Sequence, residues 1–133
     1  GKIRHAKVLQ VKSGADAGGL EVGMQWETAA GKPLLFQNTK YIFRGSGNSR
    51  FIDLIVTLSA LDERVTFNDT KDGFVGIRLA KELATGNYVS NEGFEGEQVQ
   101  DKKARWVKLS SKIKNDPVHL VLMEHPLNPG SPG

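Results

Sequence analysis

The chain has 133 residues, of which 38% are hydrophobic and 25% charged, so it can form one globular domain with a core of its own. It contains no cysteine, which excludes a disulfide framework, a thiol nucleophile and a cysteine-based zinc site. The net charge of +3 comes from interspersed signs, and no apolar run approaches the ~20 residues of a membrane helix. We therefore expect no nucleic-acid partner and no membrane span.

Apolar and polar residues alternate with a period of two through most of the chain, which predicts β-strands. The strands are expected at residues 3–11, 20–26, 51–58, 64–67, 74–79, 105–109 and 118–123. Turn-forming residues separate them at 13–19, 30–33, 44–49, 71–73 and 115–117. Short strands between closely spaced turns are typical of antiparallel sheets.

Only residues 78–84 have a composition that suits a helix, and this segment is too short to be stable alone. We interpret it as the end of a strand followed by a turn. The prediction is therefore an all-β fold, an antiparallel β-sandwich formed by a single domain over residues 1–133.

Polar, glycine and proline residues gather at the ends of the apolar runs in the second half of the chain. In chain order they are Asp69, Lys71, Gly73, Gly76, Ile77 and Arg78; Asn91, Glu92 and Gly93; Ala104, Arg105 and Trp106; and His125, Pro126, Asn128, Pro129 and Pro132. In this order the motifs, which span residues 65–132, resemble a soluble bacterial family labelled "methane oxygenase PmoA". The first half of the chain is similar more loosely.

The resemblance implies a fold similar to the galactose-mutarotase-like supersandwich, and with it the binding or processing of a sugar. It also favours a periplasmic or secreted location and implies that the chain is a central fragment of the family domain, truncated at both ends. Sheets that lack flanking strands expose their edges, so we expect self-association as a homo-oligomer through those edges. A true methane monooxygenase is not predicted, because the chain has neither a membrane span nor a ligand set for copper or iron.

His125 and Glu92 are the candidate catalytic residues. His125 stands beside an acidic residue at a predicted strand end, just before a proline-rich loop, and an imidazole can act as general acid or base. Glu92 lies in a turn and is either its carboxylate partner beside a sugar ring or a solvated loop acid. In the noncatalytic alternative, the same residues only hold turns together in a binding or structural module.

Arg78 and Arg105 are candidate substrate-binding residues, because a guanidinium offers a planar fork of donors to sugar hydroxyls. Arg78 follows Gly76 on one strand face, where the missing side chain leaves room. An equally weighted alternative pairs Arg78 with the carboxylate of Asp69 or Glu92. The resemblance adds Lys71 and Asn128 to the substrate-binding set.

A structural role is the leading interpretation for the two tryptophans and for His119, the earlier of the two histidines near the end of the sequence. Trp26 lies in an alternating strand and is expected in the core. Trp106 either packs in the core, which is the commoner outcome, or stacks on a sugar ring. His119 is interpreted as an ordinary strand residue, and the sequence shows no serine or threonine obviously paired with a histidine. No metal site and no cofactor are predicted.

Overall fold

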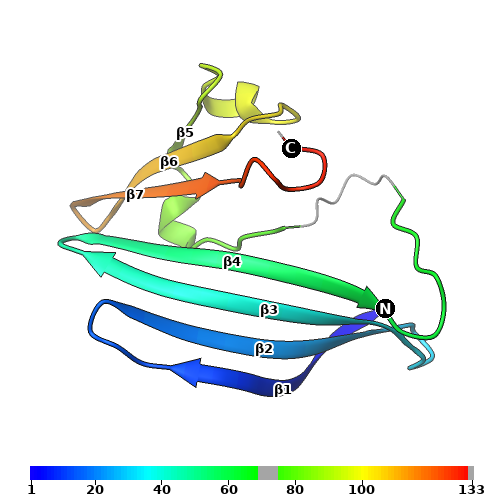
Figure 1. Cartoon of the computed structure of the whole chain (residues 1–133). Coiled ribbons are helices and arrows are strands. Elements are labelled where there is room, and N and C mark those ends of the chain that lie inside the picture. The colour runs from blue at the N-terminus through cyan, green and yellow to red at the C-terminus, as the bar shows by residue number, and fades with distance from the viewer. Residues whose placement is uncertain (69–74, 132–133) are drawn as a thin grey trace. The chain divides into compact units, whose positions relative to one another are not determined.

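The computed structural model describes residues 1–68 and 75–131. The chain divides into two compact units, Gly1–Thr70 and Lys71–Gly133, and each is described by itself. In Figure 1, strands β1 to β4 belong to the first unit and β5 to β7 to the second. Whether the two units form the single domain expected from the sequence stays a prediction.

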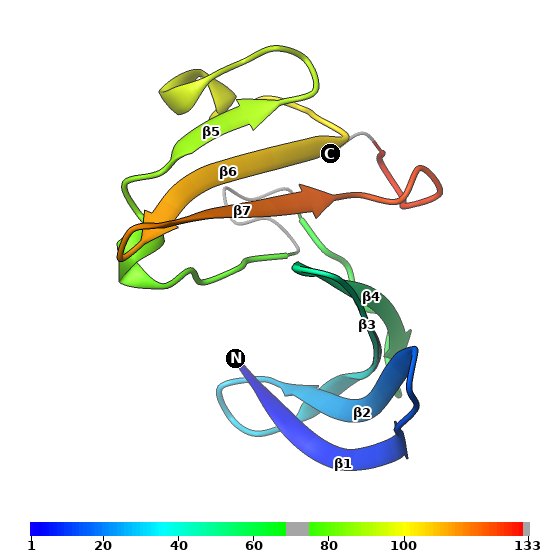
Figure 2. The same ribbon diagram turned by 90° about the vertical axis from the view of Figure 1, so that its left-hand side faces the viewer.

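The first unit is a four-stranded antiparallel meander, in which strands adjacent in the chain are also neighbours in the sheet. Its strands are β1 (Lys2–Lys12), β2 (Ala17–Glu27), β3 (Pro33–Ser46) and β4 (Ser49–Ala60). Figure 2 shows that the sheet is curved. β3 and β4 are joined by a two-residue turn in which Gly47 has a φ of 54°, a conformation that glycine adopts without steric cost.

One face of this sheet forms the core of the first unit. Val22, Leu35 and Thr39 are 9%, 2% and 1% exposed, and their register places all three on that face. Two consecutive hydrogen bonds between side chains pair the polar groups on this face. Trp26 Nε1 donates to Gln37 Oε1 at 2.7 Å, and Gln37 Nε2 donates to Thr39 Oγ1 at 2.8 Å. The half-buried indole of Trp26 therefore has the core position expected for it, with a bonded polar end.

The second unit is a three-stranded antiparallel sheet of β5 (Asn87–Ser90), β6 (Trp106–Ile113) and β7 (Asp116–Met123). Two short 3-10 helices, η1 (Lys81–Leu83) and η2 (Gly96–Val99), accompany it. One sheet face is apolar and borders a small hollow of about 210 Å³. Its lining residues are Ile77, Leu79, Tyr88, Val107, Leu109, Leu120 and Leu122.

The all-β antiparallel fold class is confirmed, since the described residues form two antiparallel sheets and only two short helical turns. The strands expected at 3–11, 20–26, 51–58, 105–109 and 118–123 all lie within or largely within observed strands. Membership of the galactose-mutarotase-like supersandwich stays a prediction.

Two predicted strands are wrong. Residues 64–67 form no strand, and neither do the described residues 75–79 of the segment expected at 74–79. Their apolar side chains cover sheets instead of joining them: the Phe67 ring meets Trp26 edge-on, with centroids 6.1 Å apart, while Ile77 and Leu79 border the apolar face of the second sheet. Residues 78–84 end in η1, and the turn predicted at 71–73 lies outside the described residues.

Candidate functional site

The end of the second sheet where β5 ends, β6 begins and β7 ends is held together by Asn91. Its Oδ1 accepts hydrogen bonds from the backbone N–H groups of Arg105, at 2.7 Å, and Trp106, at 3.1 Å. The carbonyl group of Arg105 is bonded as well, because it accepts a hydrogen bond from the Glu124 N–H at 3.0 Å. We call this end of the sheet the Arg105 edge, defined by residues 91–93, 105–106 and 124–125.

Three of the predicted site residues, Glu92, Arg105 and His125, lie at the Arg105 edge, and all three are exposed. Their side chains are not bonded to one another. Glu92 accepts a hydrogen bond from the neighbouring Asn91 amide, and His125 Nδ1 accepts one from the Leu127 N–H at 3.2 Å. The Arg105 guanidinium has no ion pair or hydrogen bond with any described residue, so it is available to a ligand.

The remaining predicted site residues are more scattered. Asn128 lies in the turn after β7, where its N–H donates to the His125 carbonyl at 2.9 Å and its side chain is exposed. Arg78 is exposed and forms no ion pair within residues 1–68 and 75–131, so the proposed pairing with Glu92 is not formed. Its other suggested partner, Asp69, and the predicted binding residue Lys71 lie outside the described residues.

Trp106 is 37% exposed, so of the two alternatives for this residue the commoner one, packing in the core, is not the one found. It stands at the start of β6 opposite Met123, which is 64% exposed, and near the end of the sheet fewer neighbours cover it. Because cross-strand partners share a face and alternate residues do too, Trp106 lies on the face opposite the apolar one. We call this the Trp106 face, made of Trp106, Lys108, Ser110 and Lys112 of β6 and Pro117, His119, Val121 and Met123 of β7.

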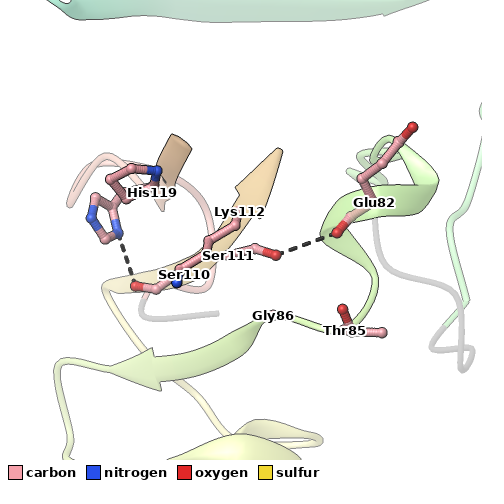
Figure 3. Close-up of a pocket in the computed structure, with 8 residues that line it drawn as sticks. Glu82, Thr85, Gly86, Ser110, Ser111, Lys112 and His119 are labelled. Atoms are coloured by element: carbon pink, nitrogen blue, oxygen red, sulfur yellow. Dashed lines mark hydrogen bonds between the residues drawn. The ribbon is translucent and has the colours of Figure 1, made fainter. Parts of the chain in front are cut away.

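An open depression of about 470 Å³ lies at the far end of β6 from Trp106. It is shown in Figure 3 and is lined by Glu82, Thr85, Gly86, Ser110, Ser111, Lys112, Pro117 and His119. Four of these residues belong to the Trp106 face. The depression is therefore continuous with the face that carries the exposed indole.

Two contacts build the wall of this depression. A Cβ on Gly86 would lie 2.3 Å from Leu109 Cδ1 and 2.8 Å from the Ser110 carbonyl oxygen, so only glycine allows the chain to pass this close to β6. The Ser111 hydroxyl donates to the Glu82 carbonyl at 3.3 Å and ties η1 to β6. Figure 3 shows the Glu82 carboxylate turned away from Ser110 and His119.

Within the depression, the Ser110 hydroxyl and His119 Nδ1 are 3.0 Å apart. The two residues are direct cross-strand partners in the β6–β7 hairpin. Sequence analysis missed this pair because the residues are separated along the chain. The signal that could have found it is the two-residue loop Lys114–Asn115, since the length of a hairpin loop sets the register.

Neither hollow described above is lined by His125, Glu92, Arg78, Arg105 or Asn128. Among the residues that the structure describes, no group of three or more histidine, aspartate or glutamate side chains could hold a metal ion. No helix in the described part of the chain is long and apolar enough to cross a bilayer.

These features define an all-β protein with an exposed tryptophan on one face of a three-stranded sheet and an open depression that borders this face. The sequence model of a protein family described as "Family of unknown function (DUF6807)" matches residues 1–133, and the chain belongs to that family. No curated protein and no solved structure matches it.

Proposed function

We propose that the chain binds a carbohydrate on the Trp106 face of its second unit. The observation that carries the proposal is the position of a partly exposed indole on the same sheet face as an open depression of about 470 Å³ whose lining includes Ser110, Lys112 and His119. A sugar ring presents an apolar face that stacks on an aromatic side chain, and hydroxyl groups that need donors and acceptors around it. The resemblance to the PmoA-labelled family and its galactose-mutarotase-like relatives points to the same ligand class.

In this proposal Trp106 supplies the stacking surface, and Lys112 and His119 in the depression supply hydrogen-bonding groups. Along β6 the Cα atoms of Trp106 and Lys112 are roughly 20 Å apart, so the ligand is an oligosaccharide that spans several rings. The free guanidinium of Arg105 stands next to the indole in the chain and adds donors at the near end of the ligand. Arg78, Lys71 and Asn128 remain proposed substrate contacts from the sequence. If the sugar is also processed, His125 is the proposed acid or base and Glu92 its carboxylate partner.

The test is a thermal-shift screen of the full chain against a glycan library, followed by titration calorimetry with each hit. Trp106→Ala should weaken binding at least about tenfold, or 1.4 kcal/mol. The matched control is Phe51→Ala, which removes an aromatic ring that is 47% exposed on β4 of the first unit, and it should bind as the unchanged chain does. Sugar binding that survives Trp106→Ala, or a library without a hit, would contradict the proposal.

A noncatalytic structural module is the second candidate, and the bonding of two side chains favours it. Asn91 and His125 both use their side chains to bond backbone N–H groups of turns. In that case, replacing these residues lowers stability, and no sugar is bound. The glycan screen therefore separates the two candidates.

We also propose that the chain self-associates through β4, an edge strand of the first sheet. Side chains on both of its faces are apolar and exposed: Ile52 is 62%, Leu54 45% and Ile55 51% exposed. An edge of this kind is a template for pairing with another copy, whereas the opposite edge, β1, carries four basic side chains that discourage pairing.

Sedimentation velocity over a range of protein concentrations tests this second proposal. The unchanged chain should form dimers as concentration rises, and Ile55→Lys should shift the equilibrium toward monomer. Val11→Lys makes the same kind of change at a residue that is 69% exposed on β1 and should leave dimer formation intact. An unchanged chain that stays monomeric at every concentration would refute the association.

A further inference from the structure

The Ser110–His119 pair has the geometry from which nucleophilic catalysis starts. A serine hydroxyl becomes a nucleophile when an adjacent base within hydrogen-bond reach takes its proton, and here the Ser110 hydroxyl oxygen and His119 Nδ1 are 3.0 Å apart. We propose that Ser110 is the nucleophile and His119 the general base of an ester hydrolysis in the depression. This inference goes beyond sugar binding and does not depend on it.

The surroundings of the two side chains distinguish this pair from a merely structural bond. Within the described part of the chain, the Ser110 hydroxyl has His119 as its one partner, and His119 Nε2 has none. Both residues line an open depression of about 470 Å³, a volume in the range that accommodates small-molecule ligands. An acyl group can therefore reach the hydroxyl.

The neighbouring serine has a different role, although it lines the same depression. The Ser111 hydroxyl donates to the Glu82 carbonyl at 3.3 Å, and the register places its side chain on the opposite side of β6 from Ser110. Ser111 is thus a structural serine beside a candidate nucleophile. Its hydroxyl supports the wall of the depression and is not aligned with His119.

Lys112 supplies the positive charge that an acyl transfer requires. It lies two residues beyond Ser110 on the same face of β6, so the two Cα atoms are roughly 6.6 Å apart, and it lines the depression. An ammonium group at this position can face the oxygen on which negative charge develops during attack at a carbonyl carbon. The one acid in the depression, Glu82, turns its carboxylate away from the pair (Figure 3).

The proposed reaction has two halves. In the first, Ser110 Oγ attacks the ester carbonyl carbon while its proton passes to His119 Nδ1, and the electron pair of the C=O bond moves to the oxygen beside Lys112. The C–O bond to the alcohol then breaks, the alcohol leaves with the proton from His119, and Ser110 is acylated. In the second half, water attacks the acyl carbon and gives a proton to His119, the Ser110–acyl bond breaks, and Ser110 regains the proton as the carboxylic acid leaves.

The substrate class is a small acyl ester of an alcohol. The depression is open, so the alcohol can be large and extend into solvent, while the acyl group occupies the space beside Ser110. No carboxylate among the described residues orients the His119 ring, so we expect a slow hydrolase with p-nitrophenyl acetate rather than a fast one.

The experiment measures release of p-nitrophenol and, separately, covalent labelling by a fluorophosphonate, with the labelled residue located by peptide mass spectrometry. The 133-residue chain should be labelled at Ser110 and should hydrolyse p-nitrophenyl acetate. Ser110→Ala should lose the label, and both Ser110→Ala and His119→Gln should lower turnover about a hundredfold.

Ser59→Ala, which removes an exposed hydroxyl on β4 of the first unit, is the control and should keep both the label and the turnover. Circular dichroism of each variant verifies that it is folded, and Ser110→Val, which has no hydroxyl and favours a strand, replaces Ser110→Ala if that variant does not fold. A folded chain with no label at Ser110 would overturn the proposal. So would turnover that is equal in Ser110→Ala and Ser59→Ala, because ester cleavage would then come from surface amines or other histidines.

Discussion

Both units are built on an antiparallel sheet, but the two sheets differ in the length of their strands and in the hydrogen bonds of their side chains. The first uses four long strands, of 11, 11, 14 and 12 residues, and side-chain hydrogen bonds join each pair of neighbouring strands. The second has strands of only 4, 8 and 8 residues, and its side chains often bond the backbone of loops. The depression and the exposed tryptophan both lie in the second unit, where more of the chain is outside strands. The difference agrees with the general rule that scaffolds are regular and binding groups lie on their irregular parts.

Each unit contains one tryptophan, Trp26 in the first and Trp106 in the second, so the stability of the two units can be measured separately. Incorporation of 5-fluorotryptophan should give two ¹⁹F resonances, one for each unit. The predictions below use these resonances to follow each sheet through a denaturant titration.

The largest expected effect is from Leu35→Ala in the first sheet. Leu35 is 2% exposed, and removing three buried carbons leaves a cavity, which costs about 2–5 kcal/mol. The midpoint read from the Trp26 resonance should fall accordingly. Ile52→Ala, at a residue 62% exposed on β4, is the control and should change that midpoint far less. Equal effects of the two substitutions would refute the assignment of the core to the face that carries Leu35.

The next effect is from Gly86→Ala in the second unit. The added Cβ would overlap the buried Leu109 side chain and the Ser110 carbonyl, and overpacking of this kind costs about 1–3 kcal/mol. The Trp106 resonance should report the loss. Gly76→Ala has no atom within 4 Å of the new Cβ and should be tolerated. If both glycine variants were equally stable, the close passage of the chain beside β6 would be wrong.

A smaller effect is expected from Asn91→Ala at the Arg105 edge. The change removes the acceptor of two backbone N–H groups and should cost about 1–2 kcal/mol if those groups are left without a partner. The line width and midpoint of the Trp106 resonance measure it. Asn128→Ala removes an exposed amide nearby and serves as the comparison. An unchanged midpoint in Asn91→Ala would mean that water replaces the lost acceptor.

The smallest effect concerns the exposed pair Lys32–Glu63 in the first unit, with 2.7 Å between Nζ and Oε1. The hydrogen bond and charge of Lys32 lower the pKa of Glu63, and those of Glu63 raise the pKa of Lys32. The Glu63 contribution is present above the pKa of unfolded glutamate and is lost as pH falls through the lower folded value. The Lys32 contribution is present below the pKa of unfolded lysine and is lost as pH rises through the raised folded value.

Glu63→Gln should therefore lower the Trp26 midpoint slightly at neutral pH and low salt, and the difference should vanish in acid or in high salt. Denaturant titrations at neutral and acidic pH, each with and without added salt, measure this change. A difference between Glu63→Gln and the unchanged chain that persists in strong acid would contradict the charge pairing.

Alternation of residues predicted β1, β2, β4, β6 and β7, although not every predicted strand has a buried face: all residues of β1 are exposed. It failed at residues 64–67 and 75–79, whose apolar side chains lie against a sheet without joining it and stay partly exposed, with Phe67 45% and Ile77 52% exposed. β3, the longest strand, was missed because its apolar residues stand in runs at 34–36 and 41–43 instead of alternating. β5 was missed because four residues between Gly86 and Asn91 are too few to show a period. A sequence pattern reports where apolar side chains recur, not which backbone groups pair.

The candidate site was foreseeable only in part. Glu92, Arg105 and His125 lie at one edge because loops that join neighbouring antiparallel strands return to the same ends of the sheet. Their side-chain partners could not be foreseen, since the Asn91 amide bonds Arg105 and Trp106 through backbone groups common to every residue. The Ser110–His119 contact depends on a register, and the residue that begins the loop, Lys114, is not a turn signal.

Lys114 has a φ of 57°, in the left-handed region that most side chains avoid, and it keeps the β6–β7 connection at its minimum length. A one-residue shift in the register of β6 and β7 would set Val118 or Leu120 opposite Ser110. His119 would then turn to the other face of β7, and Leu120 and Leu122 would leave the apolar face with it. The contact between Ser110 and His119 and the apolar face of the sheet therefore depend on the same two-residue corner, and the length of this loop is a marker for sorting the family.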